Sequence, residues 1–251
     1  MSEDRAVVIT GIDERVEVET NRTGLSHPAH ELLWNERGAS TASVGPRVWT
    51  VTARIGLWVP AGTVHSVRLP AGTWYRAARF SVWATPKTPQ WLRPFGVEIT
   101  ELLRLLLVRL SDTGLSPQSR SLNEQMVIDL LRPSEHEVAV HLPDAAVLLP
   151  MVEAVTARPA DRHSLEEWAA RLGVSGRTVG RTLRAHTGLG FTDWVASVRM
   201  QRAIELIVAG ERLDDVAAEV GYRSPSAFGA AFKRASGLTP GAFRPDSPRD
   251  V

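Results

Sequence analysis

Apolar and polar residues alternate in short runs over roughly the first 85 residues of the chain. Glycine, proline and asparagine separate these runs, as at Gly45 and Pro46. A period of two is typical of strands with one buried face, and several short strands with regular turns favour an antiparallel barrel or sandwich. The clearest runs cover residues 6–12, 16–19, 47–54 and 74–83.

A helical period replaces the alternation further along the chain. After a proline-rich linker at 85–94, apolar residues recur at helical spacing in 97–111 and 120–131, and a short strand is expected at 137–141. The later helices are expected at 150–157, 164–171, 176–186, 191–208, 213–219, 225–235 and 240–243. We therefore predict two domains, an antiparallel β-barrel over residues 1–142 and an all-α domain over residues 143–251.

One stretch of the helical half occurs twice. Residues 165–175 read Leu-Glu-Glu-Trp-Ala-Ala-Arg-Leu-Gly-Val-Ser, and residues 213–224 read Leu-Asp-Asp-Val-Ala-Ala-Glu-Val-Gly-Tyr-Arg-Ser. Apolar positions beyond the serines match at a constant offset of 49, as Val179 does with Phe228. A short helix, a glycine turn, a polar start and a second helix form the helix-turn-helix order. We predict two such motifs, at 164–186 and 213–235.

The turn of each copy carries a glycine and a serine. Gly173 and Gly221 can adopt positive φ and end the first helix. Ser175 and Ser224 can cap the second helix, because a serine hydroxyl accepts a hydrogen bond from an exposed backbone N–H.

The second helix of the first copy has a basic outward face. Such a helix fits the major groove with its N-terminal residues over base edges. Arg177 and Arg181 lie four residues apart on one face, and arginine can donate two hydrogen bonds to guanine O6 and N7. Arg184 lies further along and is expected on phosphate. The outward residues are Gly176, Arg177, Thr178, Gly180, Arg181 and Arg184.

The second copy has fewer groups for base recognition. Its outward residues are Arg223, Ser226, Gly229 and Ala230, of which Arg223 precedes the helix and Ser226 discriminates weakly between bases. We expect the first copy to supply most base specificity and the second to anchor the protein. The helix expected at 191–208 would span about 27 Å, close to the roughly 34 Å between successive major-groove faces.

The composition argues for some classes of protein and against others. The net charge is only +1, but a basic strip runs from Arg171 to Arg202 with Asp193 as its only acid. The absence of cysteine excludes disulfides and cysteine-ligated zinc. No signal peptide is visible, and no apolar segment approaches the roughly 20 residues of a membrane span. We expect a cytoplasmic protein with no membrane partner.

A set of spaced positions between about 150 and 244 forms one pattern: Ser175, Arg181, Leu183, Thr187, Gly188, Trp194, Arg199, Ala203, 216–218, 220–222, Ser224, Phe228, Phe232, Lys233, Gly237, Thr239, Pro240, Phe243 and Arg244. With these positions the segment, about 40% of the chain, resembles the AraC/XylS family of bacterial transcription regulators. Ala230 departs from the pattern, because relatives often carry arginine or another long polar residue there. The resemblance implies double-stranded promoter DNA as a partner and a homodimer, with RNA polymerase as a further partner and no enzyme activity. The expected DNA contacts are Ser175, Gly176, Arg177, Thr178, Arg181, Arg184, Arg223, Ser224, Ser226 and Lys233.

Two histidine segments mark the β half. His27 and His30 precede Glu31, and His65 ends a Pro-x-Gly-x-x-His sequence that begins at Pro60. These segments resemble the two motifs of the cupin barrel, which often precedes such a DNA-binding half. In metal-binding cupins the histidines and a carboxylate meet inside the barrel. The resemblance implies His27, His30, His65 and Glu31 or Glu36 as candidate ligands of a divalent metal.

The β half leaves alternatives open. His27 and His30 are three residues apart, so in a strand they would point to opposite faces. An organic effector could instead bind His27, His30, Trp58 and His65, or these side chains could simply be packed and hydrogen-bonded. The leucine-rich segments 98–110 and 120–131 could form a dimer interface or cover the open end of the barrel.

The leading hypothesis is a sequence-specific transcription regulator whose cupin-like barrel senses a small effector. A metal-dependent cupin enzyme fused to a DNA-binding module is the first alternative. An architectural DNA-binding protein without sequence preference is the second.

Overall fold

The chain forms two compact units. The computed structural model describes residues 8–135 and 138–244. Contacts group residues 1–44 with 51–137, here called the β unit, and residues 45–50 with 138–251, here called the helical unit. The boundary expected between residues 142 and 143 stays a prediction.

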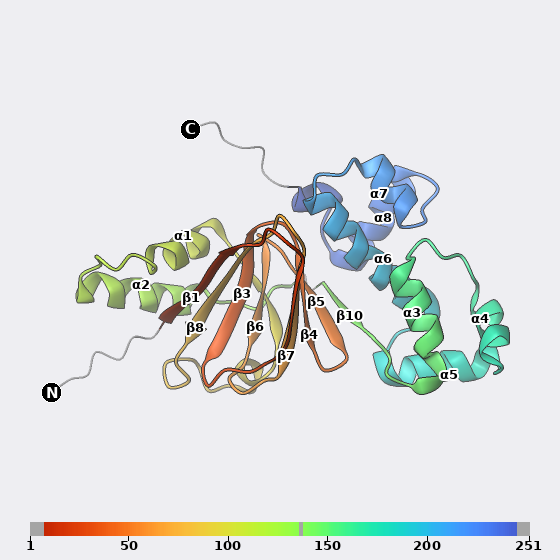
Figure 1. Cartoon of the computed structure of the whole chain (residues 1–251), viewed down its shortest axis with the longest axis horizontal. Helices are drawn as coiled ribbons and strands as arrows, with labels where there is room; N and C mark the ends of the chain where they lie inside the picture. Colours follow the sequence, from red (N-terminus) through yellow and green to blue (C-terminus); the bar gives the residue numbers. More distant parts are fainter. Residues whose placement is uncertain (1–7, 136–137, 245–251) are drawn as a thin grey trace. The chain divides into compact units, whose positions relative to one another are not determined.

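The strands form two five-stranded antiparallel sheets, in the orders β1-β8-β3-β6-β9 and β10-β5-β4-β7-β2 (Figure 1). This is the order of a jelly roll, in which the chain passes from one sheet to the other. The expected antiparallel β domain is confirmed, but the sheets stay open and do not close into a barrel, because each sheet keeps two edge strands. The strands are β1 Val8–Arg15, β2 Thr20–Leu25, β3 His30–Arg37, β4 Ser40–Val44, β5 Arg47–Val51, β6 Ile55–Val59, β7 His65–Leu69, β8 Trp74–Phe80, β9 Phe95–Glu98 and β10 Ala139–His141.

Strand β3 lies at the centre of the first sheet and assigns its residues to two faces. Glu31 pairs with Arg79 of β8 and Val59 of β6, so these side chains share one face. Leu32 pairs with Ala78 and Trp58, which lie on the opposite face. Successive side chains of β3 therefore lie on opposite faces of the sheet, one charged and one apolar.

A buried polar group fixes the end of β3. The Asn35 amide donates to the Val51 carbonyl at 2.9 Å and to the Ser40 hydroxyl at 3.1 Å, and Asn35 is fully buried. Because a buried amide without partners would be costly, this network holds the β3–β4 turn against β5.

Two helices, α1 Glu101–Arg109 and α2 Pro117–Leu130, pack against the apolar face of the first sheet (Figure 1). Residues 97–100, which we expected to be helical, instead finish β9 and place Thr100 as the N-cap of α1, where its hydroxyl accepts from Leu103 N–H. Other leucines on these helices stay exposed. The shared core includes Leu103, Leu106, Leu107, Leu110, Val127 and Leu131 from the helical segments, with Leu32, Trp34, Trp58 and Phe80 from the sheet.

The helical unit follows the expected pattern closely. The main helices are α3 Leu149–Ala157, α4 Leu165–Leu172, α5 Gly176–Thr187, α6 Phe191–Val208, α7 Leu213–Glu219 and α8 Pro225–Ser236, with 3-10 turns at Ala146–Leu148 and Pro240–Phe243. A further 3-10 turn, Pro89–Leu92, lies in the expected linker of the β unit and buries Trp91. Among the residues described, no helix is long and apolar enough to cross a membrane.

The two helix pairs of this unit meet at a seam built around α6. Arg199 of α6 donates from Nε to the Pro159 carbonyl and from Nη2 to the Asp161 carbonyl, both at 2.8 Å. Its guanidinium also lies 5.7 Å from the centre of the Tyr222 ring. Beside it, Gly221 approaches so closely that a Cβ there would lie 3.0 Å from Ala160 Cα. The loop between α3 and α4 is therefore held to the turn between α7 and α8, by the close approach of Gly221 to Ala160 and by Arg199 of α6.

Strand β10 belongs to the same unit. It pairs with β5 through Ala139–Trp49, Val140–Val48 and His141–Arg47. Val140 lies in the apolar core formed with α3, α4, α5 and α6, and the indole of buried Trp194 donates to the His141 carbonyl at 2.9 Å. The expected return of a short strand near 137–141 is confirmed for residues 139–141, while residue 137 lies outside the described residues.

Candidate nucleic-acid interface

The first helix-turn-helix comprises α4 and α5. Ser164 and Glu167 form a reciprocal capping box at the start of α4, and the Ser164 backbone N–H donates to the Glu167 carboxylate at 2.7 Å. These hydrogen bonds lower the pKa of Glu167. Gly173 ends α4 at φ +67°, and the Ser175 hydroxyl accepts from Thr178 N–H at 3.1 Å. The predicted glycine turn and serine cap are both confirmed.

Small residues let α4 approach its partners. Ala169 and Ala217, the first of the two adjacent alanines in each copy, are buried, whereas Ala170 and Ala218 are exposed. Val179 and Leu183 are fully buried on the inner side of α5. The arginines of α5 are thereby turned outward, but Gly176, which we expected to face outward, is buried because the Glu166 carboxylate lies against it.

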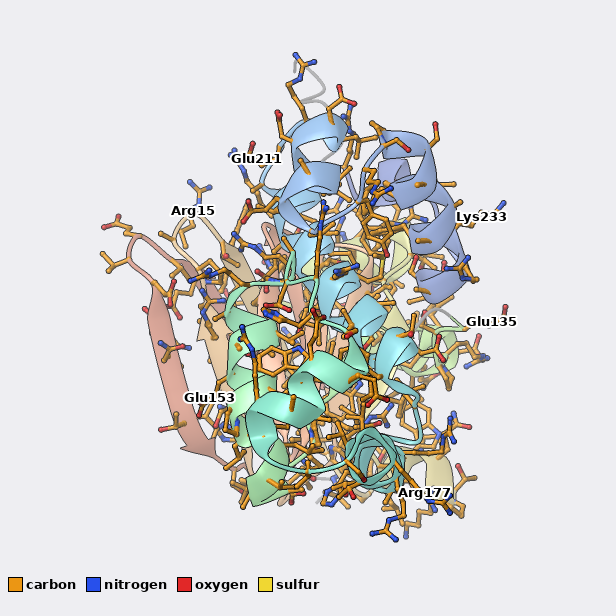
Figure 2. The ribbon with its side chains drawn as sticks, turned by 90° about the vertical axis from the view of Figure 1, so that its right-hand side faces the viewer. Arg15, Glu135, Glu153, Arg177, Glu211 and Lys233 are labelled. Carbon is orange, nitrogen blue, oxygen red and sulfur yellow. The ribbon has the colours of Figure 1, made fainter. Side chains whose placement is uncertain are left out.

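An open hollow of about 590 Å³ lies over the outward side of α5. We call it the α5 hollow, and its lining residues are Leu165, Glu166, Gly176, Arg177, Gly180, Arg181, Arg184 and Ala185. The three arginines are exposed, and Figure 2 shows Arg177 projecting away from its helix. The structure thus brings together the three arginines of α5 that the sequence singled out.

The basic strip seen in the sequence divides into two groups in the structure. Arg199 is committed to the seam, Arg202 pairs with Glu205 at 3.0 Å, and Arg171 stacks on Trp168 at 5.4 Å. None of these three lines the α5 hollow. The sequence could not separate them from Arg177 and Arg181, because their carbonyl and ring partners are set by the fold.

Three lining residues were not predicted from the sequence, Leu165, Ala185 and Glu166, and Glu166 is the charged one. It lies in the first turn of α4, with its carboxylate against Gly176 at the start of α5. The only signal in the sequence is its place in the first turn of a helix, where acidic residues are common for electrostatic reasons.

The second helix-turn-helix has the same turn and cap. Gly221 has φ +83°, and the Ser224 hydroxyl accepts from Ala227 N–H at 3.2 Å. Arg223, Ser226 and Lys233 are exposed, and Figure 2 shows Lys233 projecting outward from α8. This face offers fewer cations than α5.

Three of the candidate effector or metal residues come together in the β unit. Both oxygens of the buried Glu31 carboxylate face histidine, with His27 Nε2 at 3.4 Å and His65 Nε2 at 3.6 Å. Arg79 Nε lies 3.3 Å from the same carboxylate. His65 Nδ1 donates to the Thr63 carbonyl at 3.1 Å, which fixes the orientation of the ring. We call His27, Glu31, His65 and Arg79 the Glu31 cluster.

Tyr75 lies on the same face of the first sheet as Glu31. Burial raises the pKa of its hydroxyl, and the negative charge of Glu31 adds to that effect. Tyr75 is therefore a neutral hydrogen-bonding group on the charged face of the sheet.

His30 and Trp58 turn to the opposite face. His30 Nδ1 accepts from Ala61 N–H at 3.0 Å, and its ring stacks on Trp58 with the ring centres 5.1 Å apart. Burial lowers the pKa of His30. Trp58 is fully buried and donates to the Trp91 carbonyl at 3.2 Å. The chain bends at Pro28 and Ala29, which lets His27 reach Glu31 while His30 packs in the core.

The Glu31 cluster does not have the arrangement of a metal site. Over residues 8–135 and 138–244, no group of three or more histidine, aspartate and glutamate side chains is arranged to hold a metal ion. Within the cluster, Arg79 already supplies a positive charge beside Glu31, and His30 has turned away. The set His27, His30, Glu31 and His65 therefore does not form one ligand sphere.

Known proteins resemble this chain in sequence and in fold. A model of a helix-turn-helix domain matches residues 168–246. The transcriptional regulator NimR of Escherichia coli is 28% identical over 87% of this chain and 82% of its own length. RipA, a transcriptional regulator of Corynebacterium glutamicum, is 28% identical over 84% of this chain, which spans only 61% of RipA. The crystal structure of ToxT from Vibrio cholerae O395 aligns over 94% of this chain and 96% of its own, at 12% identity and a TM-score of 0.39.

Proposed function

Because the chain belongs to the AraC family of DNA-binding transcription regulators, we propose that α5 enters the major groove and recognises base edges through Arg177 and Arg181. The α5 hollow carries this proposal, since it gathers exposed arginines over a helix whose opposite side is fully buried. Arginine matches the two acceptors of guanine in the major groove. Arg184, in the last turn of α5, contacts phosphate, and Thr178, in the first turn, faces the groove.

The second motif anchors the protein on the same duplex. Arg223 and Lys233 contact phosphate, and Ser224 and Ser226 at the start of α8 supply weak polar contacts. Helix α6 has 18 residues, so its length of about 27 Å separates the two motifs by nearly one turn of DNA. Two contacted segments on one side of the duplex are expected.

The test begins with genome-wide mapping of bound DNA, followed by affinity measurements on the bound promoter and on random DNA. A regulator retains strong preference for its promoter at moderate salt, whereas a protein that contacts only phosphate loses binding to both steeply. Equal binding to both DNAs would contradict the proposal and favour an architectural protein.

Arg181→Ala and Arg171→Ala form a matched pair for this test. Both remove one exposed arginine of the first motif, but only Arg181 lines the α5 hollow. Arg181→Ala is expected to cost about 1–3 kcal/mol at the promoter and to relax the preference at one base pair. Arg171→Ala is expected to leave base preference unchanged. Equal losses on all sequences would make Arg181 a phosphate contact.

The Glu31 cluster supports an effector site in the β unit. We propose that a small polar molecule bonds to Glu31, His27 and His65. His30 and Trp58, which we expected in the same site, are excluded from it because they are buried on the opposite face of the sheet. An effector acts by binding better to one arrangement of the protein than to another. In the absence of effector, His65→Gln is therefore expected to bind DNA as tightly as wild type. A cell metabolite extract that alters the DNA affinity of wild type should alter that of His65→Gln less. Loss of folding in thermal unfolding would make His65 structural.

Helices α1 and α2 support a homodimer. Their inner residues cover the sheet, while Leu102, Leu105, Leu122 and Met126 remain about half exposed. Apolar side chains in this number on neighbouring helices suit a partner of the same kind. Leu105→Asp with Leu122→Asp is expected to halve the mass in sedimentation equilibrium, and an unchanged mass would refute this interface. RNA polymerase, a further expected partner, would meet the regulator at the promoter.

A further inference from the structure

The α5 hollow contains one acidic side chain among its arginines. Glu166 reaches the hollow from α4, whereas Arg177, Arg181 and Arg184 reach it from α5. Glu166 is exposed. Among the described residues, no hydrogen bond or ion pair engages its carboxylate. Its carboxylate is therefore open to an external donor.

The Glu166 carboxylate occupies the space left by the absence of a side chain at Gly176. A Cβ on Gly176 would lie 2.3 Å and 2.6 Å from the two Glu166 oxygens. Any residue other than glycine at this place would displace the carboxylate from the start of α5. Gly176 is the first residue of α5 and is buried, so the carboxylate lies beside the turns of α5 that approach base edges.

The two kinds of side chain are complementary in hydrogen bonding. The guanidinium groups can only donate, and the ionised carboxylate can only accept. In the major groove a G·C pair presents two acceptors on guanine, O6 and N7, and one donor on cytosine, the N4 amino group. Arginine and glutamate side by side in one hollow thus match both halves of one G·C pair, or of two neighbouring pairs.

The carboxylate also discriminates against the other three bases. Thymine offers O4 and guanine offers O6 and N7, all acceptors that repel a carboxylate. Adenine has an N6 donor, but its N7 acceptor lies directly beside it. Cytosine alone presents a donor with no acceptor on its own major-groove edge, so a carboxylate approaching the base edges favours cytosine.

We propose that Glu166 is a specificity-determining residue of the first motif, which accepts from the N4 amino group of a cytosine while Arg177 or Arg181 binds guanine. This inference rests on the proposed major-groove function of α5. It goes further by naming the base class and by assigning a residue from the neighbouring helix to base recognition.

The experiment uses the full chain and a library of promoter variants randomised over the segment bound by the first motif. Bound and unbound DNA are sequenced for wild type, Glu166→Ala, Gly176→Ala and Glu153→Gln. Glu153 is an exposed acid on α3 outside the hollow, so its substitution controls for the loss of one negative charge. Thermal unfolding verifies that each variant is folded.

Wild type and Glu153→Gln are expected to prefer cytosine at one position by about tenfold. Glu166→Ala should lose that preference while keeping the others. Gly176→Ala should do the same although the charge remains, because the new methyl group displaces the carboxylate. Replacing that cytosine with a pyrimidine that lacks the 4-amino group should weaken wild type about tenfold and Glu166→Ala much less.

The outcomes separate this inference from the proposed function. If wild type fails to discriminate between promoter and random DNA, the proposed function falls. If wild type discriminates but Glu166→Ala leaves every base preference unchanged, or weakens all sequences equally, Glu166 is a structural residue and only this inference is overturned.

Discussion

The two turn glycines of the helical unit share a backbone conformation but differ in their surroundings. Gly173 and Gly221 occupy equivalent places in the two motifs, with φ values of +67° and +83°. A Cβ on Gly173 would meet nothing within 4 Å, whereas a Cβ on Gly221 would lie 3.0 Å from Ala160 Cα and 3.3 Å from the Ala160 carbonyl oxygen. Substitution by alanine therefore imposes the same backbone cost at both places and a steric cost at only one.

The magnitudes follow from these distances. The left-handed backbone conformation destabilises an alanine by about 1–2 kcal/mol relative to glycine. Alanine also restricts the unfolded chain, which raises the free energy of unfolding by about 0.4–1 kcal/mol. Gly173→Ala should thus destabilise the helical unit by about 1 kcal/mol. At Gly221 the methyl group meets backbone that cannot rotate away, and overpacking of this kind adds about 1–3 kcal/mol. Gly221→Ala should cost about 3 kcal/mol in total.

Hydrogen exchange followed by mass spectrometry measures this difference within the helical unit. Gly221→Ala is expected to raise exchange in α7 and α8, and to weaken binding to a full promoter more than binding to DNA that retains only the segment of the first motif. Gly173→Ala should cause a smaller rise in exchange. If both variants lose the same stability, the close approach at the seam contributes nothing and our explanation of it is wrong.

Substitutions at three further residues test buried groups. Burial lowers the pKa of His30 below its ordinary value of 6.5, so the unfolded chain binds more protons below that pH. Stability therefore falls as the pH decreases from 6.5 through the lower folded pKa. His30→Gln should flatten the pH dependence of the unfolding midpoint between pH 7.5 and 5, leaving the contribution of His141, whose pKa burial also lowers, and an unchanged slope would refute this. Trp194→Phe removes the donor to the His141 carbonyl and part of a fully buried side chain, which should cost about 2–4 kcal/mol in denaturant unfolding, and a loss below 1 kcal/mol would contradict the packing described. Asn35→Ala leaves the buried carbonyl of Val51 without its amide donor and should lower the free energy of unfolding by about 2–3 kcal/mol in the same measurement. Asn35→Gln should be destabilised as much, because its longer side chain does not fit the buried site.

The helical unit could be predicted from the sequence because local signals agreed there. The apolar period, the serine caps and the glycine turns all indicate the same boundaries, and α6 and α7 begin and end at the predicted residues. Residues 97–100 were predicted wrongly because Val97 and Ile99 fit either a helix face or a strand. Only the pairing of β9 with β6, about 40 residues earlier, decides for the strand.

The chemistry of the interface was less accessible from sequence. Arg181 and Arg199 look alike in a basic strip, yet Arg199 donates to carbonyls about 40 residues earlier in the chain and serves the seam. Glu166 precedes Arg177 by eleven positions, and only the turn between α4 and α5 brings both into one hollow. Sequence patterns identify faces of single helices, but a site shared by two helices depends on how they cross.

The pairing of β5 with β10 means that the helical unit is not one continuous piece of chain. Residues 45–50 belong to it, Val140 fills its core, and the His141 carbonyl receives its buried indole donor from Trp194. A chimera joined after residue 142 would import foreign residues at each of these places, in the core beside Val140 and at the acceptor of the Trp194 indole. Exchange of the β unit for that of another protein therefore requires a transplant of two separate segments.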